Sequence, residues 1–540
     1  MKLLKLSLLF CFIVTCSYGQ YDSEWFYLRT HDTLTLAFKT AGNDVVYAGN
    51  DDALSQVLNK YQIYQFKKTQ RNATKDNLHR TYFVRVNSKG FLADILKNGS
   101  HVFSSGEIIP DEDKKIYEPN DYGLTSTIGE NLGLQVNLDY MDFLGVPKAW
   151  YYTTGRQEVI IGISDGAIDV ANKEFEGKTK LVQKAPFAKG HGIGVGSYAA
   201  AKGNNANGIP GVCFDCGVFT AGFNLSHVEE MAQRGAKIIN CSWSAFTYVK
   251  KQQEKVNEIF GNGSIIVGSS GNKGWKVTKG LKPYYPASYD NVISVSTVMY
   301  KYPNVQDNVK MDAKGNYYAE NIWGYLGRTV GFKDNDPSKD HQIWATSTAN
   351  LNDKVDILAP SVGVFRVSKY EREKTIEYIG DEATSPAAPL VSGTIGLMYS
   401  LYPCLPIDEV ESILKMTSIN IDHVEANRRF RGKYGAGILQ TGNAVEMVYQ
   451  LYNERETAYI RNQDFSRWNF KLTALSKEVR LEDQKFRDSA TLEVKAKNSI
   501  VIGANTHLKP NHGGSIRLAI DPTIEKQCDL ILRDPSIMQD

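Results

Sequence analysis

The chain has 540 residues, of which 42% are hydrophobic and 23% are charged, and its formal net charge is +2. This length exceeds what one hydrophobic core usually fills, so two to four domains are expected. The composition is that of an ordinary globular protein, and the nearly neutral charge argues against the strongly basic surface that binds nucleic acid.

The first 19 residues are typical of a targeting signal. Two lysines precede an apolar run, Leu6 to Val14, that is too short to span a membrane, and Ser17-Tyr18-Gly19 offers small residues for cleavage. We therefore expect a secreted protein, extracellular or periplasmic, from which residues 1–19 are removed. Lipid attachment at Cys16 is the less favoured alternative. No later run approaches ~18 apolar residues, so no transmembrane anchor is expected.

Residues 20–115 form a predicted small domain of mixed α+β type. The pattern predicts strands at Leu34–Leu36 and Tyr82–Val86 and helices over Leu54–Tyr61 and Phe91–Leu96. The charged run Asp111 to Lys115 at its end is typical of an exposed linker.

Residues 116–455 alternate apolar runs with helical patterns. A short helix is predicted over Tyr140–Trp150, and strands are predicted at Val159–Ser164, Lys237–Asn240, Ser264–Gly268, Val292–Thr297 and Val355–Leu358. Apolar runs without period-two alternation indicate strands buried on both faces of a parallel sheet. The predicted fold class is therefore α/β, with a doubly wound, mainly parallel sheet. Ligands of such sheets bind beyond the carboxyl ends of the strands.

Residues 456–540 change in character and predict a small β-rich domain. Short alternating segments, broken by glycines, occur at Leu492–Val494, Ser499–Ile502 and Ile516–Ile520. Either extra stability or attachment to a surface or substrate is compatible with such a module.

Cleavage of the signal would leave five cysteines, and an odd number leaves at least one thiol unpaired. The spacing of Cys213 and Cys216 fits a local disulfide, a redox motif or a zinc half-site. We favour a structural bridge, either between the two or from one of them to Cys241. A zinc half-site is disfavoured because no second pair of ligands with suitable spacing follows.

The segment Ala383 to Met398 contains the strongest chemical signal. Thr384-Ser385 precedes Pro386 and Pro389, which suit a first helical turn, and an apolar helical run follows. Ser385 would lie at a helix N-terminus, where unpaired N–H groups favour negative charge. Thr-Ser at this position is more often only a cap, and a nucleophile needs a histidine base and a carboxylate elsewhere.

Both partners are present in matching contexts. A buried-strand run ends at Asp165-Gly166, and His191 stands at the mouth of a run of small residues that predicts a helix. A further strand ends at Gly271-Asn272. The Asp, His and Ser motifs in this order, together with the Gly-Asn motif, resemble the subtilisin-like serine proteases (subtilases, peptidase S8 family) over about residues 120 to 450.

The resemblance implies a catalytic triad of Asp165, His191 and Ser385 that needs no cofactor for catalysis. His191 would be the general base, Asp165 would orient it, and Asn272 would donate to the oxyanion. Walls of the substrate cleft are implied at two segments on either side: Ser242, Trp243, Ser244 and Ser269, Ser270, Gly271.

A zymogen is also implied, in which residues 20–115 are a propeptide that acts as an intramolecular inhibitor and is cleaved between about 105 and 120. Expected partners are protein or peptide substrates, with no nucleic acid, and a monomer is expected. The family further suggests structural calcium at Glu174 and Asn205, whereas the loop Asn204 to Gly208 alone predicts only turns. Compared with typical subtilases, residues 298–354 are an insertion that either shapes specificity or decorates the surface.

Each site residue also has a simpler interpretation as a cap or turn former. A subtilase that is inactive and acts as a binding or scaffold protein is the alternative function. An esterase is disfavoured because no Gly-x-Ser-x-Gly motif surrounds Ser385.

Overall fold

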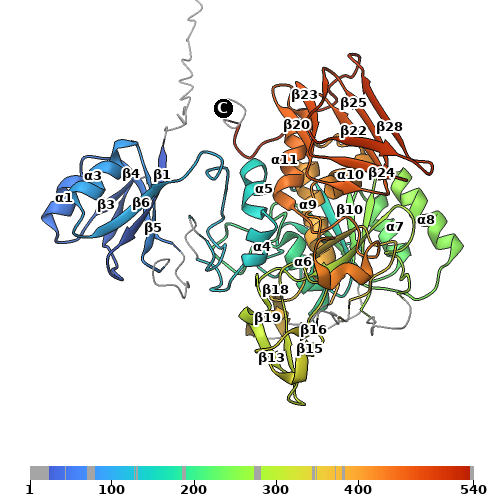
Figure 1. Ribbon diagram of the computed structural model, residues 1–540, viewed down its shortest axis with the longest axis horizontal. Coiled ribbons are helices and arrows are strands. Elements are labelled where there is room, and N and C mark those ends of the chain that lie inside the picture. Colours follow the sequence, from blue (N-terminus) through green and yellow to red (C-terminus); the bar gives the residue numbers. More distant parts are fainter. Residues whose placement is uncertain are drawn as a thin grey trace, which may run out of the picture. The chain divides into compact units, whose positions relative to one another are not determined.

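The structure is a computed structural model that describes residues 23–42, 44–69, 79–126, 128, 132–184, 190–272, 281–342, 347, 349–370, 373–379 and 383–535. The predicted targeting segment, with Cys16, lies outside these residues. The described chain forms two compact units, one ending at Lys114 and the other beginning at Lys115 (Figure 1). The second unit includes the residues assigned above to both the catalytic and the C-terminal domain.

The first unit is a four-stranded antiparallel sheet, of order β4-β5-β1-β6, with two helices against one face. Its elements are β1 (Glu24–Thr30), β2 (Phe38–Ala41), β3 (Asp44–Tyr47), α1 (Asp52–Leu58), β4 (Ile63–Lys68), β5 (Thr81–Val86), α3 (Gly90–Asn98) and β6 (Phe103–Ile108). Alternation along β1 and β5 buries Phe26, Leu28 and Val84 against Leu54 and Phe91 of the helices.

The predicted helices of this unit and the strand at Tyr82–Val86 are present as α1, α3 and β5. The strand predicted at Leu34–Leu36 is wrong, because Leu34 is exposed and its carbonyl accepts hydrogen bonds from the side chains of Tyr82 and Lys68 rather than from a neighbouring strand. Strands β1, β2, β3, β4 and β6 were not predicted.

The second unit is built on a seven-stranded sheet in which every neighbouring pair is parallel, with the order β17-β12-β11-β10-β7-β9-β8. The strands are β7 (Ile160–Ser164), β8 (Thr179–Leu181), β9 (Gly217–Ala221), β10 (Ile238–Cys241), β11 (Ile265–Ser269), β12 (Val292–Val298) and β17 (Ile357–Pro360). The predicted parallel α/β sheet is therefore confirmed. β8 and β9 were not predicted.

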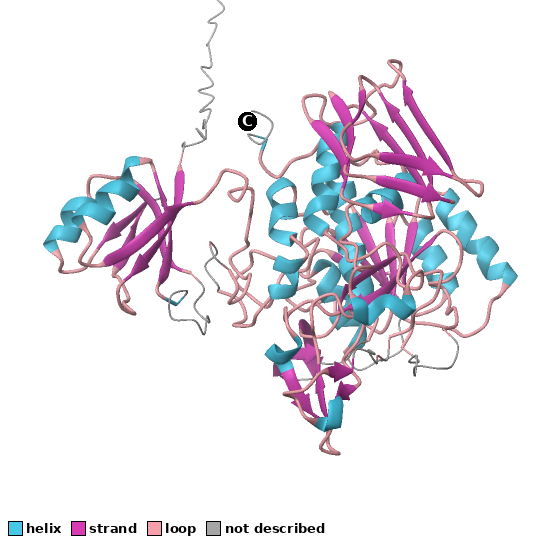
Figure 2. Ribbon diagram, in the orientation of Figure 1, coloured by secondary structure: helices cyan, strands magenta, loops and turns pink. Residues whose placement is uncertain are grey.

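Side chains that alternate along the central strands separate into two cores. Ile238 and Val267 point to the layer of α5, α6, α9 and α11, whereas Ile239 and Ile266 point to α7 and α8. The helices are α5 (Val146–Tyr152), α6 (His191–Ala200), α7 (Leu225–Gln233), α8 (Lys250–Gly261), α9 (Ala387–Leu401), α10 (Ile407–Met416) and α11 (Thr441–Tyr452). The sheet thus lies between two helical layers (Figure 2).

The helix predicted over Tyr140–Trp150 is divided into two, α4 (Asp139–Phe143) and α5. Gly145 between them has φ of +68°, a left-handed conformation that ends the first helix and redirects the chain.

The insertion after β12 forms short β-structure around a small core of its own, which includes Ile322 and Phe332. Its elements are η1 (Val305–Asn308), β13 (Val309–Met311), β14 (Tyr317–Ala319), β15 (Gly331–Phe332), η2 (Lys333–Asn335) and β16 (His341–Gln342). A hairpin of β18 (Val364–Tyr370) and β19 (Glu373–Ile379) follows β17, and η3 (Glu425–Phe430) lies between α10 and α11. The hairpin and the short strands of the insertion lie at the lower edge of Figure 1.

The C-terminal strands form a three-turn parallel β-solenoid. Three sheets, of orders β20-β23-β26, β21-β24-β27 and β22-β25-β28, each take one strand from every turn. The strands are β20 (Thr457–Arg461), β21 (Asp464–Phe465), β22 (Asn469–Ala474), β23 (Glu478–Glu482), β24 (Lys485–Asp488), β25 (Thr491–Ala496), β26 (Ile500–Ile502), β27 (His507–Pro510) and β28 (Ser515–Ile520). The predicted β-rich character is confirmed, and its inward residues join the main core of the unit.

Two disulfides cross-link the second unit. Cys213 bonds to Cys216, which is the first of the two structural bridges favoured above, and Cys404 bonds to Cys528. Among the cysteines that the structure describes, Cys241 is the free thiol, and it is buried. The second disulfide links the segment that follows the solenoid to the turn between α9 and α10.

Candidate active site

Four of the predicted site residues lie at one edge of the sheet, where three follow central strands and the fourth, His191, begins α6. Asp165 follows β7, Ser242 follows β10 and Asn272 comes shortly after β11. The chain adds β8 and β9 on one side of β7 and then β10 on the other, so the strand order reverses there. Such a reversal opens a crevice at the carboxyl ends of parallel strands, where side chains from separate segments can meet.

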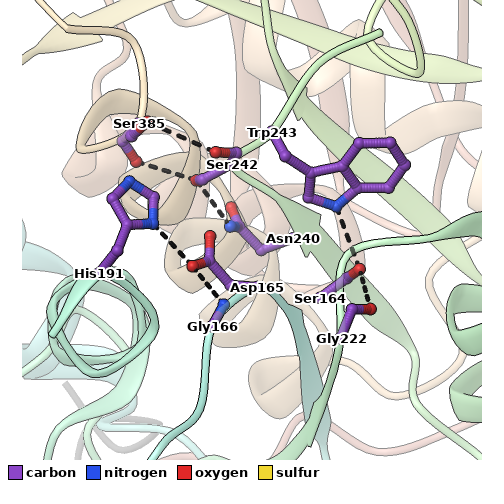
Figure 3. A network of polar contacts seen from close by, with 9 residues as sticks. All are labelled: Ser164, Asp165, Gly166, His191, Gly222, Asn240, Ser242, Trp243 and Ser385. Carbon is purple, nitrogen blue, oxygen red and sulfur yellow. Dashed lines mark hydrogen bonds and ion pairs between the residues drawn. The ribbon is translucent and has the colours of Figure 1, made fainter. Parts of the chain in front are cut away.

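Asp165 and His191 are joined by a hydrogen bond of 2.6 Å between Oδ1 and Nδ1 (Figure 3). Asp165 is 3% exposed and its Oδ1 also accepts the Gly166 N–H at 2.6 Å. A carboxylate can only accept, so Nδ1 carries the proton, and in the neutral ring Nε2 is left as the basic nitrogen. In Figure 3 the free edge of this imidazole is turned toward Ser385.

Close backbone contact sets the distance between these two residues. His191 is the first residue of α6, and Gly190 before it is left-handed, with φ of +70°. A Cβ at Gly192 would collide with the Gly166 carbonyl oxygen. The turns that carry the carboxylate and the imidazole can therefore touch only because residue 192 has no side chain.

Ser385 lies two residues before α9, whose N-cap is Pro386. Its Oγ donates to the Ser242 carbonyl oxygen over 3.4 Å, and Ser242 Oγ donates to the Ser385 carbonyl oxygen over 3.0 Å. Among the described residues, Ser385 Oγ makes no hydrogen bond to His191. Nucleophile–base hydrogen bonds are often loose in unliganded sites and tighten with substrate.

The orientation of the Asn272 amide follows from its partners. Its Oδ1 accepts the Thr384 N–H at 2.7 Å and the Thr384 hydroxyl at 2.8 Å. A backbone N–H can only donate, so the atom facing it must be the amide oxygen. Nδ2 is therefore directed away from Thr384, on a side chain that is exposed to solvent.

The predicted cleft walls divide into two groups. Ser242 contacts Ser385 as described, and Trp243 Nε1 donates at 3.1 Å to Ser164, which in turn donates to the Gly222 carbonyl oxygen (Figure 3). Ser269 and Ser270 are 2% and 0% exposed, so their side chains support the second wall from behind.

Tyr284 lies against Gly271 of the second predicted wall, and sequence reasoning missed it. A Cβ at Gly271, where φ is +101°, would approach its ring to 3.0 Å, so the ring lies directly over the glycine. Tyr285 beside it pairs with Ala245, which brings the two predicted walls together. The signal that could have identified Tyr284 is its place in an aromatic pair ahead of Pro286.

Glu174 and the loop from Asn204 to Gly208 come together at a second polar site. Glu174 is 1% exposed, its Oε1 accepts the Asn207 amide, and its Oε2 has no hydrogen-bond partner in the part of the chain that is described. Burial raises the pKa of Glu174 to about 7, and the charge of Asp121 acts in the same direction. The lone oxygen is therefore held without the solvation that a carboxylate needs.

Asp121, which sequence reasoning missed, completes this site. Its two oxygens accept the N–H groups of Asn204 and Asn205 at 3.0 and 3.1 Å. Within the described ranges no three His, Cys, Asp or Glu side chains converge as a metal-binding group. Calcium, however, also takes amide and backbone oxygens, so two carboxylates beside an asparagine loop fit that ion.

The model of the subtilase family matches residues 97–437, and the chain therefore belongs to this family. It is 28% identical over 170 residues to a thermophilic serine proteinase of Bacillus sp. (strain AK1), which covers 28% of this chain and 41% of that protein. It is 24% identical over 283 residues to subtilisin DY of Bacillus licheniformis, covering 49% of this chain and 84% of the relative.

A calcium-dependent protease of a Nostoc species is also similar, with 25% identity over 364 residues, or 59% of this chain and 50% of that protein. The chain thus spans half or less of the length of two of these three relatives.

Proposed function

We propose that this chain is a secreted serine endopeptidase that hydrolyses peptide bonds with Ser385 as nucleophile. The observation that carries the proposal is the 2.6 Å hydrogen bond between Asp165 and His191, whose imidazole edge faces a serine at the start of α9. Membership of the subtilase family supports the same chemistry.

In the proposed reaction His191 Nε2 takes the proton of Ser385 Oγ while Oγ attacks the carbonyl carbon of the substrate. This requires the hydroxyl to turn from the Ser242 carbonyl toward the imidazole. The tetrahedral oxyanion would accept from Asn272 Nδ2 and from the Ser385 N–H. His191 then gives its proton to the leaving amine as the C–N bond breaks, and water hydrolyses the acyl-enzyme by the same steps.

Asp165 holds the imidazole through Nδ1 during both half-reactions. Its negative charge stabilises the imidazolium that forms when Nε2 is protonated, without itself accepting the proton. The substrate would bind as an extended strand along residues 242–244 and gain main-chain hydrogen bonds with little sequence preference. Tyr284 over Gly271 would close the opposite wall.

Calcium would be held by Glu174, Asp121 and amide oxygens of the loop that contains Asn205. The similarity to a protein named as a calcium-dependent protease supports this assignment. When bound, the ion would neutralise the two carboxylates and brace the loop, and it would take no part in peptide hydrolysis.

Residues 20–115 are proposed as the propeptide of a zymogen, to be cleaved between about 105 and 120. The boundary between the two compact units, at Lys114 and Lys115, lies inside that interval. No helix in the described ranges is both long and apolar enough to cross a membrane.

The experiment is labelling of the processed protein with a phosphonofluoridate, followed by peptide mapping and a peptide-cleavage assay. We expect one adduct, on Ser385, and loss of cleavage in proportion to labelling. Ser385→Ala should be neither labelled nor active. A processed protein that is folded but takes no label would overturn the proposal and favour the alternative, an inactive subtilase that binds other proteins.

A further inference from the structure

A chain of buried hydrogen bonds leads from the middle of α9 through β10 to the residue that carries the proposed nucleophile. Ser392 Oγ donates to Asn240 Oδ1 at 3.0 Å, and Asn240 Nδ2 donates to Ser242 Oγ at 2.9 Å. Ser242 Oγ then donates to the Ser385 carbonyl oxygen at 3.0 Å. Figure 3 shows the last two of these contacts.

The direction of every proton in this chain is fixed by its last member. A carbonyl oxygen can only accept, so the single proton of Ser242 Oγ is used toward Ser385. Ser242 Oγ must then accept from Asn240, which places Nδ2 on that side of the amide and Oδ1 toward Ser392. Ser392 can also donate to the Ala388 carbonyl oxygen at 3.2 Å, but Asn240 Oδ1 has no other donor among the described residues.

Burial makes these contacts strong constraints. Asn240 and Ser392 are 0% exposed and Ser242 is 5% exposed, so water cannot replace a lost partner. An unpaired polar group in such a place costs more than the hydrogen bond itself contributes, and the network therefore favours one arrangement of its members.

The two peptide groups that flank Ser385 are held by different elements. The peptide before it is held through the Thr384 carbonyl oxygen, which accepts the Ala387 N–H at 3.2 Å. The peptide after it joins Ser385 to Pro386, which has no N–H, so its carbonyl is its only hydrogen-bonding group. Ser242 Oγ holds that carbonyl, and the orientation of Ser385 on this side depends on it.

We propose that Asn240 is a positioning residue: by donating to Ser242 it commits the Ser242 proton to the Ser385 carbonyl and so keeps Ser385 aligned with His191. This inference rests on the proposed function. It adds a residue that touches neither substrate nor the reacting atoms. A small displacement of a nucleophile is enough to cost about 10²-fold in rate, so indirect positioning can be measured.

Asn240→Asp is the sharpest test because it keeps the shape of the side chain and reverses one hydrogen bond. An ionised carboxylate can only accept, so Ser242 would donate to it and release the Ser385 carbonyl. We expect kcat at about pH 8 to fall about 10- to 100-fold, with KM within about threefold of the wild type. The variant-to-wild-type ratio of kcat should rise as the pH falls, since a protonated carboxyl can donate to Ser242 again.

Asn427→Asp is the matched control. Asn427 is also 0% exposed and uses both ends of its amide, donating to the Gly324 carbonyl at 2.7 Å and accepting the Leu326 N–H at 3.3 Å, away from the site. We expect it to lower stability while leaving the pH dependence of kcat per labelled Ser385 unchanged. If Asn240→Asp gives a kcat ratio that is constant with pH, as the control does, the positioning role is refuted.

Ser242→Ala gives an independent test that retains Asn240, in case Asn240→Asp does not fold. It removes the hydroxyl but keeps the Ser242 main-chain carbonyl, and we expect a fall in kcat similar to that of Asn240→Asp at high pH. Combined, the two substitutions should lower kcat no more than either alone, because they break the same chain. Full kcat in Ser242→Ala would overturn the inference. Absence of labelling in the wild type would instead overturn the proposed function.

Discussion

Replacement of Asn272 by aspartate would test the proposed oxyanion donor with little change to the structure. Asn272 Oδ1 accepts two hydrogen bonds from Thr384, at 2.7 and 2.8 Å, and a carboxylate oxygen can accept both. Only the group directed away from Thr384 changes, from an N–H donor to a negatively charged acceptor. Asn272→Asp should therefore fold normally and bind substrate, but fail to stabilise the tetrahedral intermediate.

The size of the effect follows from the role of a single oxyanion donor. Loss of one such donor lowers kcat by about 10²- to 10³-fold, or about 3–4 kcal/mol in the barrier. The carboxylate would also repel the developing oxyanion, so we expect Asn272→Asp at or beyond the upper end of that range. Asn272→Ala should lose a similar amount of kcat and, in addition, stability, because it leaves the buried Thr384 without its acceptor.

The assay is kcat on a chromogenic peptide amide, normalised to the amount of Ser385 that reacts with a phosphonofluoridate. Thr384→Val is the matched control, because it removes the hydroxyl contact to Asn272 and keeps the backbone one. It also removes the acceptor of the Gly271 N–H, which donates to the Thr384 hydroxyl at 3.2 Å, so two hydrogen bonds are lost. Each is worth about 1 kcal/mol, so kcat should fall by no more than about 30-fold. Folded Asn272→Asp that keeps kcat within tenfold of the wild type would remove Asn272 from the oxyanion hole.

Three further predictions concern the triad, the proposed calcium site and the disulfides. Asp165→Asn should lower kcat by about 10⁴-fold at neutral pH, since the amide no longer fixes the proton on His191 Nδ1; a fall below tenfold, measured with the same peptide amide, contradicts the triad. Burial raises the pKa of Glu174 from 4.5 to about 7, so the folded state holds that proton more tightly than the unfolded state. Without calcium the free energy of unfolding should therefore decrease by up to about 3 kcal/mol as the pH rises from below 4.5 through 7, and added calcium should restore it mainly above pH 7. In thermal melts with EDTA or calcium, Glu174→Gln should reduce both effects, with the remainder due to Asp121, whose pKa burial also raises. A calcium response that is unchanged in this variant would exclude the site. The Cys404–Cys528 disulfide links residues 124 apart in sequence and Cys213–Cys216 residues 3 apart, which corresponds to about 5 and about 2 kcal/mol of chain-entropy stabilisation. The Cys404→Ala/Cys528→Ala variant should therefore have the lower melting temperature of the two double variants, and the opposite order would contradict the entropic argument.

The sequence was sufficient for features that depend on neighbouring residues. Continuous apolar runs identified the strands that are buried on both faces, and Asp165 and Asn272 stood out because a polar residue follows each run. Gly145 was the exception, since a single glycine in a helical pattern does not reveal that its φ is +68°. The divided helix followed from that conformation.

Features that depend on distant pairings could not be predicted in the same way. In the β-solenoid each strand pairs with the equivalent strand of the next turn, as Thr457 does with Glu478. A short alternation of apolar and polar residues occurs in any β-structure, so it does not reveal this pairing. Asp121 meets Asn204 and Asn205 although 83 and 84 residues separate them in sequence. The hydrogen bond from Ser392 to Asn240 likewise joins a helix and a strand that only the fold brings together.

Successive side chains of β10 point to opposite faces of the sheet, and this alternation determines both the packing of the core and the position of Asn240 at the proposed site. Ile239 and Cys241 face the layer of α7 and α8, so Asn240 between them must face α9, where Ser392 is its partner. A shift of β10 by one residue would turn Ile239 toward Ser392 and bury Asn240 among the apolar side chains of the opposite layer, unpaired. The register that gives the sheet its two apolar cores is thus the register that places Ser242 against Ser385. The packing of the sheet and the alignment of the proposed nucleophile therefore depend on the same register of the same strand.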